Sequence, residues 1–385
     1  MGLDAFNPVL MLAIIPPATY FRLMKYRRFG RTELNIPVFS CGGMRYQYKW
    51  QDVDPKDVPQ ANQENLEATI HRAVELGINH IETARGYGSS EMQLGSVLPQ
   101  FPREKLIVQT KVAPKATQKE FLETFETSLR YLKLDYVDLF SLHGINNQEL
   151  LDWSTGKNGC LAAARQLQKE GRVRHIGFST HATTDIIEAA INTGEFDYVN
   201  LHWYFVNDLN WSAVQAARKQ DMGVFIISPN DKGGKLYAPP PKLVDLCAPL
   251  TPMQFNSLYC LARPEVHTLS CGAARPSDFD EHIRTLDFYD QIPGVIAPME
   301  QRLQAFDAER RVGGGRRAKV VVDPRWVRQL DPGRRDEALA ERRRALVAEA
   351  GEGEGGSAVR RGPESPEPGR RALVQGRIHE GGVRA

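Results

Sequence analysis

The stretch GINHIETARGYGSSEMQLG, residues 77–95, contains the features around which the rest of the chain can be arranged. Its apolar part, residues 80–84, predicts a short buried strand, and the glycines on either side of Tyr87 predict a loop directly after it. Glu82 lies near the end of the expected strand, and Tyr87 lies on the loop. Because functional groups are often carried by loops on a rigid scaffold, this carboxylate and phenol form a candidate catalytic pair.

The same plan of strand and helix recurs along the chain. Eight short apolar runs indicate strands, and each is followed by a segment in which apolar residues recur at helical spacing. The expected strands cover residues 38–41, 80–84, 106–111, 136–143, 175–180, 198–204, 224–228 and 267–272. Strands that alternate with amphipathic helices pair in parallel, and eight such units over roughly 270 residues predict a closed (β/α)8 TIM barrel. An N-terminal β-hairpin is expected at residues 26–37.

An open, doubly wound sheet is the alternative architecture. It would require a glycine fingerprint after the first strand, and Gly42-Gly43-Met44 does not provide one. At the level of single helices, Asn62 is expected to cap the first helix, and Thr117 with Glu120 matches a capping box. A single helix is expected to run to about Glu170.

Composition excludes several classes of protein. The chain has 385 residues, a net charge of +2 and 42% apolar residues, which is typical of a globular protein and gives no overall attraction to nucleic acid or membrane. The five cysteines are scattered and show no close ligand spacing, so no metal or iron–sulfur cluster is expected. Such cysteines suit a reducing, cytoplasmic location.

Three regions are expected from the distribution of residue types. Residues 1–23 are interpreted as a disordered or mis-assigned leader with translation starting at Met24, residues 24–300 as the barrel, and residues 301–385 as an Arg/Gly-rich, mostly disordered tail. Residues 308–385 hold 17 arginines against 12 acidic residues and contain one aromatic residue, Trp326. A solvated tail is favoured over an RNA- or DNA-binding arm, because acids are interleaved with the arginines and stacking aromatics are lacking. Translation of a shifted reading frame is a further hypothesis for this composition.

The expected chemistry follows from the strand ends. In an eight-unit barrel the active site lies at the carboxyl ends of the strands, where Lys111 and His143 would join Glu82 and Tyr87. An ammonium beside a phenol lowers the pKa of the phenol, and a carboxylate can keep that ammonium charged and oriented. A histidine can donate a hydrogen bond to a carbonyl oxygen. These groups suit proton delivery to a carbonyl while a nicotinamide cofactor supplies the hydride.

Four blocks of sequence resemble the aldo/keto reductase family, and the likeness extends over about residues 24–292. They are ETARGYGSSE at residues 82–91, TK at 110–111, LRYLKLDYVDL at 129–139 leading to His143, and KEGRVRHIGFS at 169–179. The resemblance implies a (β/α)8 barrel that reduces aldehydes and ketones with NADPH. It also implies that Tyr87 is the general acid, that Lys111 and Glu82 tune it, and that His143 orients the carbonyl.

The resemblance extends to the cofactor. The family's contacts imply that the nicotinamide cofactor is bound by Gly43, Met44, Ser179, Thr180, Asn200, Ser228, Gly272, Arg275 and Glu281. NADPH is expected and NADH is not excluded, because Arg275 is the one obvious phosphate partner on the last unit. Residues 41–44 and 202–204 resemble a subgroup described as iron–sulfur-type aldo/keto oxidoreductases, but this chain lacks their cysteine cluster.

Three positions depart from the family's pattern. Glu82 stands where the family has aspartate, Thr180 where it has asparagine, and Ile227 where an aromatic ring often stacks on the nicotinamide. These departures motivate a second hypothesis, a nicotinamide-binding regulatory or sensor protein with weak or no turnover. A third hypothesis is a nucleic-acid-associated protein acting through the tail. The favoured partner is a small-molecule carbonyl substrate, with no membrane and no nucleic acid, and the sequence leaves the oligomeric state open.

Overall fold

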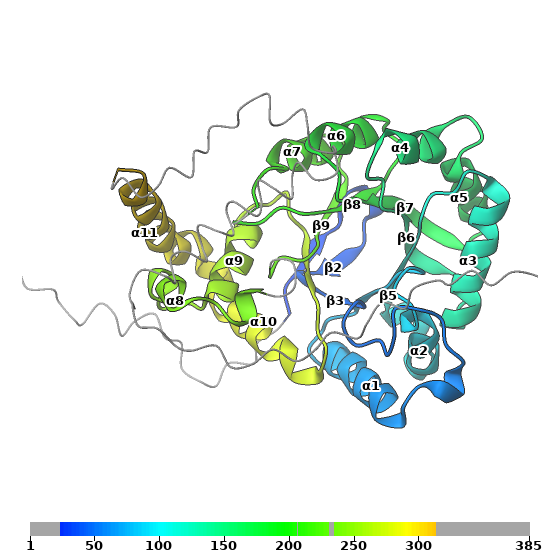
Figure 1. Ribbon diagram of the computed structural model, residues 1–385, viewed down its shortest axis with the longest axis horizontal. Coiled ribbons are helices and arrows are strands. Elements are labelled where there is room, and N and C mark those ends of the chain that lie inside the picture. The colour runs from blue at the N-terminus through cyan, green and yellow to red at the C-terminus, as the bar shows by residue number, and fades with distance from the viewer. Residues whose placement is uncertain (1–23, 206, 231–234, 313–385) are drawn as a thin grey trace, which may run out of the picture.

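The eight expected strands form a closed barrel of parallel strands in a computed structural model that describes residues 24–205, 207–230 and 235–312 (Figure 1). The order around the barrel is β10-β3-β4-β5-β6-β7-β8-β9, which confirms the (β/α)8 prediction. The strands are β3 (Phe39–Gly42), β4 (His80–Glu82), β5 (Ile107–Val112), β6 (Val137–His143), β7 (Val173–Ser179), β8 (Tyr198–Leu201), β9 (Gly223–Ile226) and β10 (Thr268–Cys271). The expectations for the leader and for the tail beyond residue 312 lie outside the described residues.

Helices surround the barrel, as Figure 1 shows. They are α1 (Gln60–Glu75), α2 (Ser90–Val97), α3 (Gln118–Leu132), α4 (Gln148–Thr155), α5 (Cys160–Lys169), α6 (Thr184–Asn192), α7 (Trp211–Lys219), α8 (Pro241–Cys247), α9 (Pro252–Leu261), α10 (Phe279–Thr285) and α11 (Ile292–Val312). Short 3-10 helices occur at Gly30–Thr32, Pro55–Asp57, Leu98–Gln100, Arg103–Lys105, Lys235–Tyr237, Pro276–Asp278 and Leu286–Gln291. Within the described ranges, no helix is both long and apolar enough to cross a bilayer.

Two details of the helices differ from the sequence prediction. Asn62 does not cap α1, because the helix begins two residues earlier after Pro59, whose backbone is extended. The single helix expected up to Glu170 is two helices, since the chain leaves helical geometry at Gly156 and re-enters it after Gly159. Thr117 does cap α3: its hydroxyl oxygen accepts a hydrogen bond of 3.3 Å from the Glu120 N–H.

The expected hairpin is present and covers the amino-terminal end of the barrel. Strands β1 (Tyr26–Arg28) and β2 (Asn35–Pro37) pair antiparallel. Their connection places Gly30 with φ +54° so close to Gly223 that a Cβ at residue 30 would lie 2.4 Å from the Gly223 nitrogen. An apolar layer behind the hairpin fills this end of the barrel, and it contains Phe29, Ile36, Ile107, Leu139, Tyr198 and Phe225.

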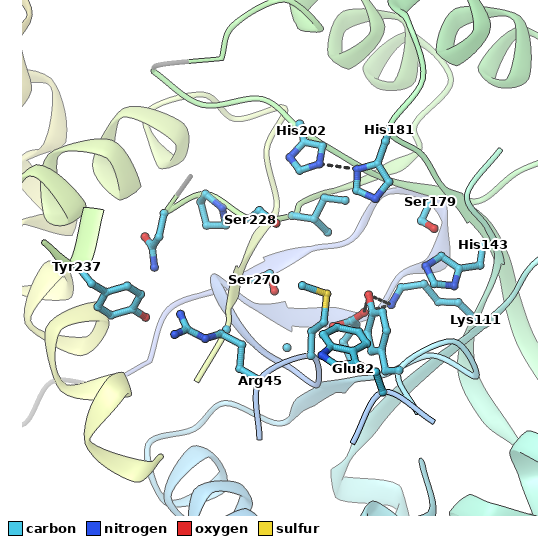
Figure 2. A pocket seen from close by; sticks show the side chains of 18 residues that line it. Arg45, Glu82, Lys111, His143, Ser179, His181, His202, Ser228, Tyr237 and Ser270 are labelled. Carbon is cyan, nitrogen blue, oxygen red and sulfur yellow. Dashed lines mark hydrogen bonds and ion pairs between the residues drawn. The ribbon is translucent and has the colours of Figure 1, made fainter. Parts of the chain in front are cut away.

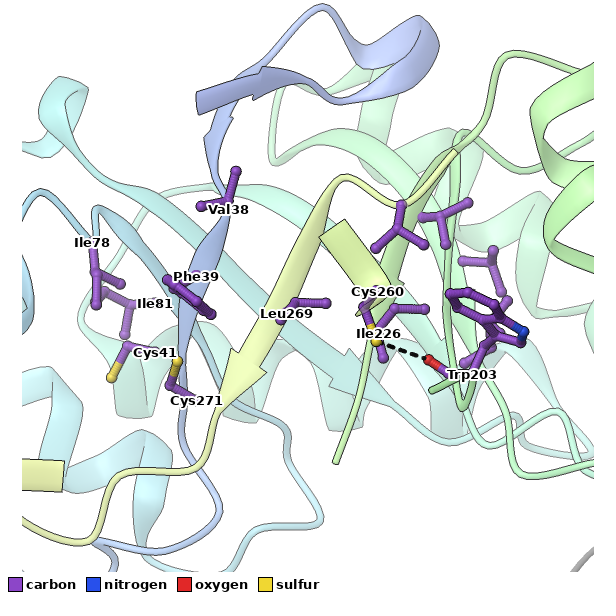
Figure 3. Packing of buried hydrophobic residues seen from close by; sticks show 14 of the residues in the cluster. Val38, Phe39, Cys41, Ile78, Ile81, Trp203, Ile226, Cys260, Leu269 and Cys271 are labelled. Atoms are coloured by element: carbon purple, nitrogen blue, oxygen red, sulfur yellow. Dashed lines mark hydrogen bonds between the residues drawn. The ribbon is translucent and has the colours of Figure 1, made fainter. Parts of the chain in front are cut away.

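The seam between the first and last barrel strands is closed by apolar packing. Phe39 and Leu269 are register partners across β3 and β10, and so are Cys41 and Cys271 (Figure 3). All four side chains are fully buried. On the outside of the barrel, Phe140 of β6 packs against the apolar face of α3 with ring centroids 4.9 Å from Phe125. Burial of these faces stabilises a barrel whose strand tips are then fixed relative to one another.

The barrel interior carries polar side chains in successive layers. Ser40, His80, Gln109, Ser141 and Tyr198 form a buried hydrogen-bonded chain, with steps of 2.7, 3.1, 2.9 and 2.9 Å in that order. Because side chains alternate along a strand, the residue two positions later on each strand also faces inward, one layer closer to the carboxyl end. That layer brings the candidate catalytic residues together.

Candidate active site

A lysine, a glutamate and a tyrosine meet at the carboxyl ends of β4 and β5. The Lys111 Nζ forms an ion pair with the Glu82 carboxylate and donates a hydrogen bond of 3.2 Å to the Tyr87 hydroxyl. The Tyr87 hydroxyl in turn donates to the Glu82 Oε1 at 3.3 Å. Each of the three groups therefore contacts the other two, although they come from two strands and a loop.

The backbone around Tyr87 explains how the loop holds this geometry. Lys111 Nζ also donates a hydrogen bond of 2.9 Å to the Thr83 carbonyl, and this bond connects the tip of β5 to the end of β4. Gly88 has φ +55°, and a Cβ there would lie 2.1 Å from the Lys49 carbonyl oxygen, so the turn after Tyr87 requires glycine. Glu82, which stands where the family has aspartate, keeps the ion pair with Lys111. The second oxygen of its carboxylate accepts a hydrogen bond of 3.3 Å from the Gly43 N–H.

His143 completes the group from the end of β6. Its ring meets the Tyr87 ring edge-on, with centroids 5.7 Å apart and an interplanar angle of 85°. Burial lowers the pKa of His143 to about 3, and the positive charges of Lys111 and His181 act in the same direction. The imidazole is therefore neutral at physiological pH and keeps one N–H available as a donor.

The ionisation of the tyrosine differs from the sequence prediction. Lys111 was expected to lower the pKa of Tyr87, but burial of the phenol raises that pKa above its usual value. Burial likewise lowers the pKa of the Lys111 ammonium, while the ion pair with Glu82 opposes this effect. The Tyr87 hydroxyl is therefore protonated at neutral pH, which is the form that an acid must have before it reacts.

These four side chains line a cavity of about 530 Å³. The other described residues of its lining are Gly42, Met44, Arg45, Trp50, Ser179, His181, His202, Ile227, Ser228, Pro229, Asn230, Tyr237, Ser270 and Gly272. The cavity lies at the carboxyl ends of the barrel strands (Figure 2), where the active sites of such barrels are found.

Of the nine predicted cofactor residues, four line the cavity and five, including Asn200, do not. Met44, Ser179, Ser228 and Gly272 line the cavity. Gly43 lies behind the cavity wall, and its carbonyl accepts a hydrogen bond of 3.0 Å from the Ser90 hydroxyl.

Three of the remaining predicted residues are occupied elsewhere. The Thr180 hydroxyl is buried and donates a hydrogen bond of 2.7 Å to the Ile145 carbonyl. Arg275 has a largely exposed side chain that pairs with Asp278 at 3.1 Å. The Glu281 carboxylate accepts a hydrogen bond from the Thr251 hydroxyl.

Asn200 provides a test of whether a nicotinamide cofactor fits here. It is the register partner of Ser179 across β7 and β8, and its side chain is fully buried. Among the described residues, neither polar atom of its amide has a hydrogen-bond partner. A buried amide without partners costs about 1–3 kcal/mol, so a ligand that offers both a donor and an acceptor would satisfy it. A primary carboxamide such as that of nicotinamide has this chemistry, and the residues therefore fit the cofactor.

Several cavity residues were missed by the sequence analysis. Arg45, Trp50, His181, His202 and Tyr237 all line the cavity. The alternation of side chains along a strand would have indicated two of them, because His181 lies two positions after Ser179 and His202 two positions after Asn200. The loop residues carry no comparable signal. In the part of the chain that the structure describes, no group of three or more His, Cys, Asp or Glu could hold a metal ion.

The sequence model of the aldo/keto reductase family matches residues 39–233, just over half of the chain. Together with the barrel and the arrangement of the four side chains, this match shows that the chain belongs to the aldo/keto reductase family. The match covers β3 to β9 and therefore includes Glu82, Tyr87, Lys111 and His143.

Two curated relatives and one solved structure illustrate the likeness. The NADH-specific methylglyoxal reductase of Escherichia coli is 27% identical over 187 residues, covering 43% of this chain and 56% of that protein. A putative voltage-gated potassium channel subunit beta from Schizosaccharomyces pombe is 24% identical over 336 residues, covering 72% of this chain and 93% of that protein. A holo-form aldo-keto reductase from Bacillus halodurans superposes with a TM-score of 0.60 at 19% identity, covering 72% and 96% of the two chains. The chain spans about half the length of the first curated relatives that it matches.

Proposed function

We propose that this protein is an NADP(H)-dependent oxidoreductase that reduces an aldehyde or ketone to an alcohol. The observation that carries the proposal is the mutual contact of Tyr87, Lys111 and Glu82 beside His143 in one cavity. A protonated phenol, an ion pair and a neutral imidazole at one point suit the delivery of a proton to a carbonyl oxygen.

Tyr87 is the proposed general acid. Its hydroxyl is protonated at neutral pH and donates a hydrogen bond of 3.3 Å to the Glu82 carboxylate when no carbonyl is present. A substrate oxygen in the cavity would accept this proton in place of the carboxylate.

Lys111 and Glu82 are proposed to stabilise the tyrosinate that remains after proton transfer. The Lys111 Nζ lies 3.2 Å from the oxygen on which the negative charge develops. Because both charged groups are buried, the ammonium interacts with this oxygen more strongly than it would in water. Glu82 holds the ammonium in place through the ion pair.

His143 is proposed to orient the carbonyl. Its neutral ring lies edge-on to Tyr87, so an N–H of the imidazole and the phenol can bind the same oxygen. Two donors at one oxygen position the carbonyl for reduction and stabilise charge on that oxygen.

The nicotinamide cofactor, when bound, supplies the hydride that the protein's side chains cannot provide. Ser179 and Asn200 are proposed to hold its carboxamide, and Met44, Ser228 and Gly272 to line the rest of its site. NADPH is proposed as the preferred form because Arg45 faces the cavity with a guanidinium that can bind a phosphate. One relative is described as NADH-specific, so both cofactors belong in the test.

The catalytic unit is proposed to occupy residues 24–300, although α11 is continuous across residue 300 up to Val312. A cytoplasmic location is proposed from the free, buried cysteines. The proposed partner is a small carbonyl compound.

The proposal is tested by loading the protein with NADPH or NADH and following protein fluorescence. The loaded protein is then mixed rapidly with an activated aldehyde. We expect tighter binding of NADPH and a loss of reduced-nicotinamide absorbance in a single turnover. Tight cofactor binding without any hydride transfer would refute the reductase proposal.

A second candidate is a nicotinamide-binding regulatory protein. Ile227 lies in the cavity wall, where the family often has an aromatic ring, and Thr180 is turned away from the cavity. A relative described as a putative potassium channel beta subunit covers most of the chain. The rapid-mixing experiment separates the two candidates, because the regulatory protein would bind NADPH but transfer no hydride at a useful rate.

A further inference from the structure

Exposed apolar side chains gather at the cavity. Among the described residues, five large hydrophobic side chains are exposed to solvent, and three of them line the cavity: Met44, Trp50 and Tyr237. Trp50 is the most exposed of the five, at 63%. Single exposed apolar residues are common on protein surfaces, but several of them around one cavity indicate a surface that binds an apolar group.

Trp50 lies next to the proposed general acid. Its indole meets the Tyr87 ring edge-on, with ring centroids 6.3 Å apart and an interplanar angle of 82°. The same phenol contacts His143 on another side, with centroids 5.7 Å apart. Tyr237, by contrast, lies beside Arg45 on the far side of the cavity from His143 (Figure 2). Of these two exposed aromatic rings, the indole is therefore the one within reach of a carbonyl compound bound at Tyr87.

The backbone around Trp50 packs directly on the turn that carries Tyr87. The Ser89 N–H donates a hydrogen bond of 3.0 Å to the Lys49 carbonyl, and the Lys49 N–H donates one of 3.1 Å to the Ser89 hydroxyl. A Cβ at Gly88 would lie 2.4 Å from the Trp50 carbonyl carbon, so glycine is what allows the two segments to touch. The position of Trp50 is therefore set by the catalytic loop itself.

An ion pair two residues further along the chain fixes the same segment. Asp52 pairs with the largely buried Arg85, and it accepts a hydrogen bond of 3.3 Å from the Tyr131 hydroxyl. The Arg85 guanidinium also donates a hydrogen bond of 2.8 Å to Glu91, which is fully buried. Because these contacts fix the backbone of Trp50 before a ligand arrives, less conformational entropy is lost when a ligand packs on the indole.

We propose that the indole of Trp50 binds the group attached to the substrate carbonyl, and that the protein therefore favours aldehydes or ketones in which this group is an aromatic ring. This inference rests on the proposed carbonyl reductase function and names its substrate class. A carbonyl oxygen at the Tyr87 hydroxyl lets a ring bonded to the carbonyl carbon reach the indole, and aromatic rings pair favourably at centroid separations of about 4.5–7 Å. The contact also removes the exposed indole surface from water.

The test compares benzaldehyde with propanal, which has the same reacting group without the ring. The quantity measured is the ratio of kcat/KM for benzaldehyde to that for propanal, and comparing this ratio between variants cancels the intrinsic reactivity of the two aldehydes. We expect Trp50→Ala to lower the ratio about tenfold, as loss of one aromatic contact with its buried surface implies. The change should lie in KM for benzaldehyde, because the contact is made equally in the ground state and the transition state. Trp50→Phe keeps a ring and should retain most of the wild-type ratio.

Two controls accompany these variants. Val244→Ala truncates an exposed apolar side chain of α8 that is not among the described residues of the cavity lining, and it should leave the ratio unchanged. The melting temperature of each variant shows whether it is folded, and a titration followed by the fluorescence of NADPH gives its Kd for the cofactor.

The possible outcomes separate the inference from the proposed function. An unchanged ratio in a folded Trp50→Ala variant that still reduces both aldehydes would overturn the inference and leave the reductase function standing. A weaker NADPH Kd with an unchanged ratio would also overturn the inference, because the indole would then contact the cofactor and not the substrate. Failure of the wild-type protein to reduce either aldehyde would overturn the proposed function and this inference with it.

Discussion

Replacement of Lys111 by methionine would leave the Glu82 carboxylate inside the barrel without a cation beside it. The Lys111 side chain is 1% exposed and the Glu82 side chain 4% exposed, so water cannot take the place of the ammonium. The remaining contacts of the carboxylate are the Tyr87 hydroxyl and the Gly43 N–H, each at 3.3 Å. Breaking a buried ion pair in this way costs about 3–5 kcal/mol.

Protonation of Glu82 limits this cost. A solvated glutamate has a pKa of about 4.3, and each pH unit above it corresponds to about 1.4 kcal/mol, so protonation at about pH 7 costs about 3.7 kcal/mol. At about pH 5 the same step costs about 1 kcal/mol. In the variant the folded-state pKa of Glu82 is raised above its unfolded value, so stability is retained at low pH and lost as pH rises.

The free energy of unfolding of Lys111→Met should therefore fall below that of the wild type by about 3–4 kcal/mol at about pH 7, and by about 1 kcal/mol at about pH 5. Urea unfolding followed by circular dichroism measures both values. The double variant Glu82→Gln/Lys111→Met should recover stability to within about 1 kcal/mol of the wild type without recovering turnover.

Lys25→Met is the matched control, since it breaks an ion pair with Asp290 that is exposed. It should change stability by less than about 1 kcal/mol. A loss in Lys111→Met that is equal at the two pH values would contradict the reasoning, because Glu82 would then not be the charged partner.

Three other outcomes are expected. Asn200→Leu removes a buried amide that has no hydrogen-bond partner among the described residues. A fluorescence titration should therefore show NADPH binding about tenfold weaker than in the wild type, while the free energy of unfolding stays within about 1 kcal/mol of the wild-type value. Acid should destabilise the protein as pH falls from about 6.5 towards 4 in a pH series of urea unfolding, because burial lowers the pKa of five histidines in the folded protein and the unfolded chain then binds more protons. The five histidines are His80, His143, His175, His267 and His282. Gly177→Ala should lower the free energy of unfolding by about 1–3 kcal/mol in thermal unfolding, because the added Cβ would lie 2.5 Å from the Tyr198 carbonyl oxygen. Gly294→Ala is the control: a Cβ there meets open space, and the free energy of unfolding should change by less than about 0.5 kcal/mol.

The barrel was predictable because its signal is repeated eight times. Each strand is a short apolar run and each helix has a polar and an apolar face, so an error in one unit does not change the count. The α3 face illustrates this, since Phe121, Phe125, Leu129 and Leu132 recur at helical spacing in the sequence and all four are buried. The helix ends were less predictable, because Pro59 starts α1 before Asn62 could cap it.

The cavity was predictable only in part. The tips of β4, β5 and β6 carry polar residues at the ends of apolar runs, and this pattern can be recognised from the sequence alone. The raised pKa of Tyr87 depends on burial by segments distant in sequence, which the sequence does not report. The orientation of Thr180 away from the cavity likewise depends on the Ile145 carbonyl, which belongs to the preceding βα loop.

The Tyr87 hydroxyl is proposed to supply the proton for carbonyl reduction. Single-turnover hydride transfer in Tyr87→Phe loaded with NADPH tests this role, with Tyr237→Phe as the matched control because Tyr237 is another tyrosine of the cavity wall. We expect Tyr87→Phe to bind NADPH but to transfer hydride about 10²–10⁴-fold more slowly than the wild type, and Tyr237→Phe to stay within about tenfold of the wild-type rate. A rate in Tyr87→Phe equal to that of the wild type would show that Tyr87 is not the general acid.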